Sequence, residues 1–140
     1  MALGEKLFEE TGQAMHFRII KVHPTEGTTM EVSFTSDLKG FGNFPSGKNM
    51  GSGVVTQYPH GVVDGSYQGK LDTTAGDQIV WWAHEKGRIA NGGKIKSLII
   101  VSAFTNSQKL SPWINDMIMA LEAERDPATH HSKTIAYEWK

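Results

Sequence analysis

The sequence predicts an all-β fold: a single closed or nearly closed antiparallel β-barrel of seven or eight strands, with a short N-terminal helical segment. Apolar and polar residues alternate most regularly over residues 63–72, which is typical of a half-buried strand. Residues 77–85 and 95–105 carry apolar side chains on both faces, as expected for strands of a sheet that encloses an interior and is covered outside. The 140 residues suffice for one domain spanning 1–140.

The N-terminal quarter changes its periodicity near residue 14. Residues 3–13 predict a short helix or a capping segment, because their apolar residues fall at helical spacing and Gly12 supplies a stop. Residues 15–19 and 29–36 then alternate with period two and predict two half-buried strands. The sequence HPTEG between them contains the Pro and Gly of a hairpin connection.

The C-terminal part admits two interpretations. Residues 111–125 contain good helix formers, but the final segment 134–140 alternates and needs a neighbouring strand. Residues 117–125 are the nearest candidate in sequence, so we favour a strand there, preceded by a short helical turn at 112–116.

Composition restricts the chemistry and the partners. The chain has no cysteine, which excludes disulfides, thiolate metal sites and cysteine nucleophiles. Fourteen basic and fifteen acidic residues give a net charge of −1 without a basic cluster, so we expect no nucleic-acid partner. We find no signal-peptide pattern and no membrane-spanning apolar run, so we expect a soluble cytoplasmic protein without a membrane partner. This weak net charge leaves homo-oligomerisation unobstructed.

One segment is close to a nucleotide-binding loop. Residues 42–49, GNFPSGKN, have the two glycines and the lysine of that motif, but Asn49 replaces the hydroxyl residue that holds magnesium. Glycines and β-branched residues follow, so the required helix and the alternating α/β pattern are both missing. We therefore reject a nucleotide site and predict no cofactor.

The same glycine-rich stretch, residues 39–53, admits two other interpretations. It is either a mobile or bulged segment in which glycines allow a sheet to curve, or a flexible flap. Such a flap would cover the mouth of the barrel with Phe41, Phe44 and Met50.

Five polar or aromatic residues are candidates for lining a binding cavity. His84 shares a strand face with Trp82, where it is either a hydrogen-bonded core or interface histidine or an acid–base group against indole. Glu122 is either exposed, the simpler interpretation, or an inward carboxylate with a raised pKa. Gln68 and Asn115 are candidates only through the family resemblance given in the next paragraph, which implies that each could bind the polar end of a ligand or cap backbone groups at the rim. The six histidines show no metal-ligand spacing, so no metal site is predicted.

Four segments resemble an uncharacterised family of small bacterial and archaeal proteins: GEKLFEETG, YQGKLDTTAGDQIVWWA, SQKLSPWIN and the terminal YEWK. The resemblance covers nearly the whole chain. It implies an allene-oxide-cyclase-like, or calycin-like, closed antiparallel barrel and a cyclic or dimeric assembly. Allene oxide cyclases steer ring closure in an apolar cavity, but their catalytic motif has no match here, so no catalytic residue is transferred.

These observations lead to three functional hypotheses. The first is binding of a small, mostly apolar molecule inside the barrel. The second is a cofactor-independent isomerase or cyclase acting on a lipid-like or polyketide-like substrate. The third is a structural homo-oligomer whose barrel is filled by its own side chains.

Overall fold

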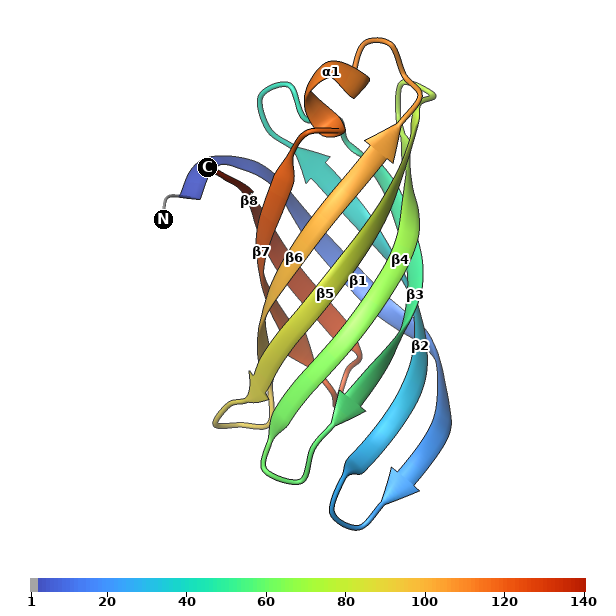
Figure 1. Cartoon of the computed structure of the whole chain (residues 1–140), viewed down its shortest axis with the longest axis vertical. Coiled ribbons are helices and arrows are strands. Elements are labelled where there is room, and N and C mark those ends of the chain that lie inside the picture. The colour runs from blue at the N-terminus through green and yellow to red at the C-terminus, as the bar shows by residue number, and fades with distance from the viewer. Residues whose placement is uncertain (1–2) are drawn as a thin grey trace.

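Eight antiparallel strands form one closed barrel in the computed structural model, which describes residues 3–140 (Figure 1). Each strand pairs with the next, and the last pairs with the first. The predicted fold class is therefore confirmed. The elements in chain order are β1 (Leu3–His23), β2 (Gly27–Gly40), β3 (Gly47–Gln57), β4 (Val62–Thr73), β5 (Gln78–Ile89), β6 (Ile95–Thr105), α1 (Ser111–Ile114), β7 (Ile118–Asp126) and β8 (His131–Trp139).

The predicted N-terminal helix is wrong, because residues 3–13 form the first half of β1. This half pairs with β2 on one side and with β8 on the other, from Leu3 opposite Trp139 to Gln13 opposite His131. These two ladders of hydrogen bonds close the barrel, and they outweigh the local helical preference of residues 3–13.

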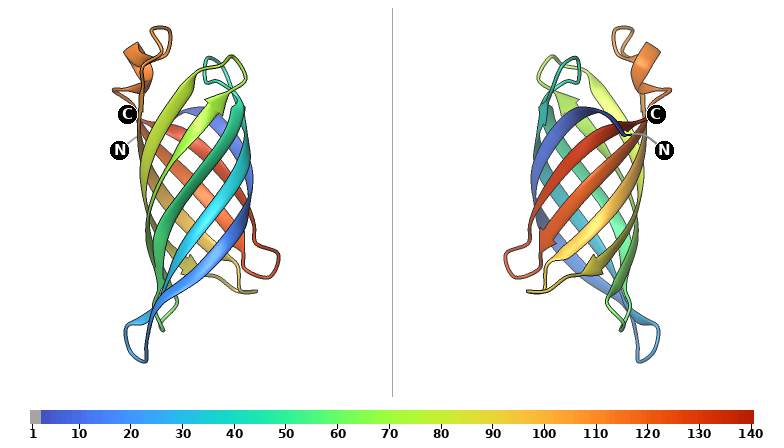
Figure 2. Two further views of the ribbon diagram at one scale, coloured as in Figure 1. Left: turned by 90° about the vertical axis from the view of Figure 1, so that its right-hand side faces the viewer. Right: turned by 90° about the vertical axis from the view of Figure 1, so that its left-hand side faces the viewer.

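Residues 15–19 are extended as predicted, but the prediction that their apolar face is buried is wrong. Met15 is 65% exposed and Ile19 is 62% exposed. The reason is the length of β1, whose second half forms with β2 a hairpin that projects past the end of the barrel (Figures 1 and 2). On β2, by contrast, Val32 is buried in the barrel.

The C-terminal prediction is confirmed. Residues 111–114 form the short helix α1, and β7 and β8 pair from Met119 opposite Glu138 to Asp126 opposite His131. The helix lies at the opposite end of the barrel from the projecting hairpin (Figure 2).

Glycines on β3 and β4 make room inside the barrel for two large aromatic rings. A Cβ atom on Gly69 would lie 2.4 Å from the Trp81 ring, and one on Gly53 would lie 2.4 Å from the Tyr67 ring. An eight-stranded barrel has an interior just wide enough for side chains, so the glycines of β3 and β4 leave the space that the rings of Tyr67 and Trp81 occupy. The face of β4 that carries Tyr67 and Leu71 points inward and lines the interior.

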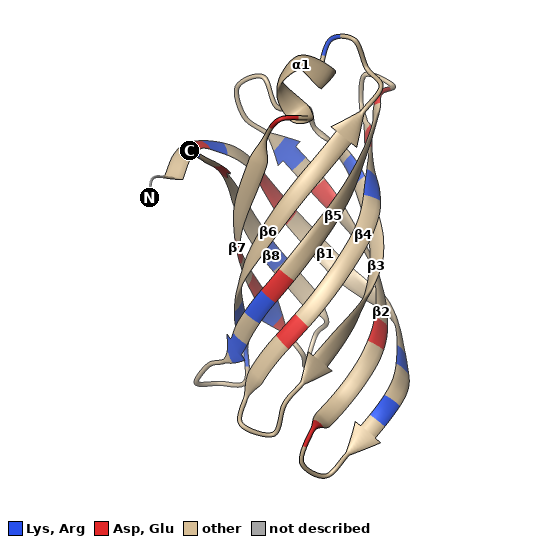
Figure 3. Ribbon diagram, viewed as in Figure 1, with Lys and Arg blue, Asp and Glu red and all other residues tan. Residues whose placement is uncertain are grey.

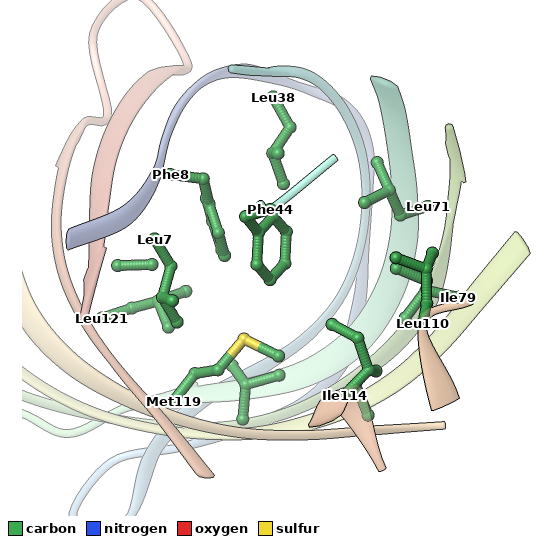
Figure 4. Close-up of a cluster of buried hydrophobic side chains, with 13 residues drawn as sticks. Leu7, Phe8, Leu38, Phe44, Leu71, Ile79, Leu110, Ile114, Met119 and Leu121 are labelled. Carbon is green, nitrogen blue, oxygen red and sulfur yellow. The ribbon is translucent and has the colours of Figure 1, made fainter. Parts of the chain in front are cut away.

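The end of the barrel beneath α1 is closed by apolar side chains. Phe44, from the β2–β3 connection, is buried and packs against Phe8 with ring centroids 4.9 Å apart (Figure 4). Ile114 of α1 is fully buried in the same cluster. Phe44 of the glycine-rich segment therefore covers this end of the barrel, as expected from the sequence. Met50, which was also expected to do so, is exposed on β3.

Basic and acidic residues are interspersed over the strands (Figure 3). On the projecting hairpin, for example, Arg18 of β1 lies 3.3 Å from Glu31 of β2. Among residues 3–140, no helix is long and apolar enough to cross a bilayer.

The contact between Gly69 and Trp81 predicts the effect of a single methyl group. In Gly69→Ala the new Cβ would lie 2.2 Å from the Met50 carbonyl oxygen and 2.4 Å from the indole, so the sheet must shift. We expect a loss of about 1 to 3 kcal/mol in the free energy of unfolding, measured by urea denaturation. Gln68→Ala, one residue away on the exposed face, should change it far less, and equal losses in both variants would contradict this packing.

Candidate functional site

The barrel encloses a cavity of about 130 Å³ with a mostly apolar lining. Phe34, Trp81, Ala83 and Ile99 point inward and line it, yet each retains accessible surface although the barrel wall is closed. That surface faces the cavity. The interior is therefore not completely filled by its own side chains, in contrast to the tight packing usual for small barrels and protein cores.

A carboxyl group lies among these apolar side chains. Oε2 of Glu10 on β1 accepts hydrogen bonds from the Ser36 hydroxyl and from Asn49 Nδ2, the latter at 2.7 Å. The amide of Asn49 is oriented in turn by Trp81, whose Nε1 donates to Asn49 Oδ1 at 2.7 Å. Four strands thus hold one carboxylate oxygen in a defined position.

Burial controls the ionisation of Glu10. Removal of the carboxyl group from water raises its pKa above the ordinary value, and the hydrogen bonds from Ser36 and Asn49 offset only part of that rise. A carboxyl group with a raised pKa exchanges its proton closer to neutral pH, which suits general acid–base chemistry.

A second polar cluster lines the same cavity. Arg125 Nη2 donates to Glu85 Oε1 at 2.8 Å, and the Tyr67 hydroxyl donates to that same oxygen at 2.8 Å. Glu85 is only 1% exposed, so its charge depends on these two partners. Burial, more than any neighbouring charge, raises the pKa of the Tyr67 hydroxyl. Tyr67 therefore serves as a neutral hydrogen-bonding group.

Two buried polar atoms have no hydrogen-bond partner within residues 3–140: Nε of Arg125 and Oγ of Ser97. They lie on neighbouring strands, because Ser97 of β6 pairs with Ala123 of β7, two residues from Arg125. This end of the barrel thus retains hydrogen-bonding capacity that the described residues do not use.

Further polar groups on the lining come from β8 and the turn before it. Thr134 pairs with Glu10 and Ser132 with Gly12 in the β1–β8 ladder, and both Thr134 and Ser132 line the same cavity as Glu10. His130 also lines the cavity and has a left-handed backbone with φ of 62°. Its ring packs against Phe17 with centroids 4.7 Å apart. Within residues 3–140, no three His, Asp or Glu side chains are grouped as metal ligands.

The structure does not bring the five sequence-predicted residues together. Gln68 and Glu122 are exposed on the outer surface, where Trp82 is 51% exposed and the His84 side chain is 61% exposed. His84 contacts Asp64 at 3.4 Å and Ser66 at 3.3 Å there. None of the five is among the residues between 3 and 140 that line the cavity, and their role in ligand binding stays a prediction.

Asn115 has a structural contact that explains its position. Its Oδ1 accepts a hydrogen bond from the Thr105 backbone N–H at 2.8 Å, and its Nδ2 donates to the Thr105 carbonyl. The side chain therefore caps backbone groups at the end of β6 beside α1. Capping at the barrel rim is one of the two roles that the sequence predicts for Asn115.

Sequence reasoning missed the polar residues inside. Glu10 fell in the segment assigned to a helix, and Asn49 was considered only for its place in the near-nucleotide motif. Glu85 carried a usable signal, because it continues the apolar face of Ile79, Trp81 and Ala83 with a charged residue. A charge on a strand face that is otherwise apolar indicates a buried, paired group.

Comparison with known proteins identifies the fold. No protein-family model matches the chain, and no curated protein matches it. A protein of unknown function from Clostridium acetobutylicum is 17% identical, with a TM-score of 0.84 over 100% of both chains. A β-barrel-like protein from Acinetobacter baumannii is 14% identical, with a TM-score of 0.83 over 99% of this chain and 96% of that one.

A third solved structure is described as an enzyme from Penicillium herquei. It is 15% identical, with a TM-score of 0.68 over 96% of this chain and 92% of that chain. At these identities the comparisons show a shared fold. The first two matches agree with the resemblance to an uncharacterised barrel family.

The buried ion pair predicts an unequal pair of mutational effects. Arg125→Leu leaves the charge of Glu85 buried without its cationic partner, so we expect a loss of about 3 to 5 kcal/mol in the free energy of unfolding. Arg18→Leu removes an exposed pair with Glu31 and should cost much less. Chemical denaturation measures both, and similar small losses would show that Glu85 is solvated.

The raised pKa of Glu10 predicts a pH-dependent stability difference. The folded state binds the Glu10 proton more tightly than the unfolded state, so this group favours folding below its unfolded pKa and loses that contribution as pH rises through its folded pKa. Glu10→Gln removes the ionisation. The variant should therefore gain melting temperature relative to the wild type at pH 8, with a smaller gain at pH 4, and a difference independent of pH would contradict the burial of this carboxyl.

Proposed function

We propose that this protein binds a small, mostly apolar molecule inside the barrel. The observation that carries the proposal is the cavity of about 130 Å³ between Trp81, Ala83 and the facing strands. An engineered apolar cavity of about 150 Å³ takes up benzene, so this interior suits a molecule of about one six-membered ring. Larger ligands occupy pockets of about 300 Å³ or more and would require side chains to move.

The polar groups of the lining support a ligand with at least one polar atom. Glu10 at one place on the wall and the Tyr67–Glu85–Arg125 cluster at another are the groups that would fix its orientation. A few placed polar groups in an otherwise apolar pocket are typical of small-molecule sites.

A second candidate function is a cofactor-independent isomerase or cyclase. The specific observation in its favour is the Glu10 carboxyl in an apolar cavity with a raised pKa. The barrel from Penicillium herquei described as an enzyme lends support by analogy of fold alone. The allene-oxide-cyclase-like assignment stays a prediction within this candidate.

The expected homo-oligomer also stays a prediction. Several large apolar side chains on the outer face of β5 and β6 are exposed in the single chain, including Trp82, Ile100 and Phe104. Analytical ultracentrifugation of the purified chain would measure its assembly state. A cytoplasmic location is likewise still a prediction.

Benzene binding, followed by NMR, tests the cavity. The four tryptophan indole N–H signals are internal probes, and Trp81→Phe identifies the one that lines the cavity. We expect saturable benzene shifts of the Trp81 signal, while the signal of the outward Trp82 stays in place.

Two neighbouring substitutions provide the matched control. Ala83→Leu places extra volume in the cavity and should abolish the shift, whereas His84→Leu, on the outer face of the same strand, should retain it. The comparison also tests the sequence-based prediction for His84. An unchanged Trp81 signal in the wild type would support the filled-barrel hypothesis instead.

A further inference from the structure

We propose that Glu10 is a catalytic acid–base residue that moves a proton between two carbon atoms of a small, uncharged carbonyl compound held in the cavity. This inference rests on the proposed binding function and assigns it a reaction and a substrate class. Four observations support it: the hydrogen bonds of Glu10, its apolar surroundings, the hydroxyls beside it and the size of the cavity.

The hydrogen bonds of Glu10 divide its two oxygens into different roles. Oε2 accepts from Ser36 and Asn49, while within residues 3–140 the structure records no hydrogen bond to Oε1. Glu10 lines the cavity, so Oε1 is the oxygen left for a bound molecule. A carboxyl group held by one oxygen, with the other free, is positioned for proton transfer without further ordering.

The indole of Trp81 fixes which end of the Asn49 amide faces Glu10. Because Trp81 Nε1 can only donate, Asn49 must present its oxygen to the indole and its nitrogen to Glu10. Asn49 is therefore a positioning residue. It keeps the Glu10 carboxyl oriented in both protonation states, since its donor bonds an ionised or a neutral carboxyl oxygen.

The surroundings of Glu10 suit an uncharged substrate. The cavity wall is mostly apolar, and the positive charge of Arg125 is engaged by Glu85. A charged ligand would lose its hydration without a free counterion in the cavity, which is costly. The same apolar environment raises the pKa of Glu10 toward neutral pH, where a carboxyl group can both take up and release a proton.

Two hydroxyls are placed to stabilise charge on the carbonyl oxygen. Thr134 lies directly opposite Glu10 in the β1–β8 ladder, and Ser132 lies two residues along on the same inward face. Within residues 3–140 the structure records no side-chain hydrogen bond for either hydroxyl. They are therefore available as donors to an oxygen that gains negative charge.

A β,γ-unsaturated ketone shows how the step balances. Ionised Glu10 takes a proton from the carbon between the carbonyl and the C=C bond, and the electron pair of that C–H bond moves toward the carbonyl to form a dienolate. Protonated Glu10 then returns the proton to the far carbon of the former C=C bond. The double bond ends in conjugation with the carbonyl, Glu10 is ionised again, and no oxidant or other reactant is consumed.

The test uses 3-cyclohexen-1-one, a six-membered ring ketone matched to the cavity. We expect the wild type to convert it to 2-cyclohexen-1-one, measured as the rise in absorbance of the conjugated enone. Glu10→Gln should reduce the rate about 100-fold or more, as removal of a positioned acid–base group does. Thr134→Val should lower the rate and leave binding unchanged.

Glu9→Gln is the matched control, because Glu9 is the adjacent residue of β1 and pairs with Lys6 outside the cavity. Its rate should equal that of the wild type. Equal rates for the wild type, Glu10→Gln and the buffer would overturn the inference.

Binding is measured separately with cyclohexanone, through the Trp81 indole signal of the wild type and of Glu10→Gln. Binding to both variants, with isomerisation by the wild type alone, is the result expected. Binding without isomerisation would overturn the catalytic role of Glu10 and leave the proposed binding function intact. Absence of binding would overturn the binding function, and with it this inference.

Discussion

The pairing of β1 with β8 is the constraint on which the rest of the structure depends. It joins the two ends of the chain, from Leu3 opposite Trp139 to Gln13 opposite His131, and closes the eight strands into a barrel. Once the sheet is closed, the alternation of each strand assigns every second side chain to a limited interior. The same closure places Glu10 inside, because the segment that carries it is part of the wall. A helix at residues 3–13 would have opened the barrel and exposed that carboxyl.

The side chains inside the barrel differ strongly in size, and this difference leaves the space that forms the cavity. Glycines of β3 and β4 accommodate the rings of Trp81 and Tyr67, while Ala83 and other small residues leave space elsewhere. Phe44 and α1 close one end with apolar contacts. The resulting cavity is apolar apart from a few polar groups, and the carboxyl groups of Glu10 and Glu85 are held by hydrogen bonds from other strands. Burial of a carboxyl group is unfavourable for folding unless it is hydrogen-bonded, and these hydrogen bonds offset part of that cost.

The sequence was sufficient for the fold class and for much of the strand pattern. The alternation of residues 63–72 correctly predicted the strand β4, and the final alternating segment correctly required β7 as its neighbour. The prediction of an N-terminal helix was wrong because the spacing of apolar residues within a segment carries no information about hydrogen bonds to a strand more than 100 positions away. That error also concealed Glu10. The outward direction of Trp82 and His84 could not be deduced either, because both faces of β5 are apolar and only closure decides which one is inside.

A crystal structure of the protein under xenon pressure would show whether the barrel contains an accessible apolar cavity. Xenon binds in apolar cavities of about this size and is readily located by its electron density. We expect a xenon atom inside the barrel, in contact with Trp81 and Ala83. A barrel interior filled by rearranged side chains, with no xenon bound there, would contradict this expectation.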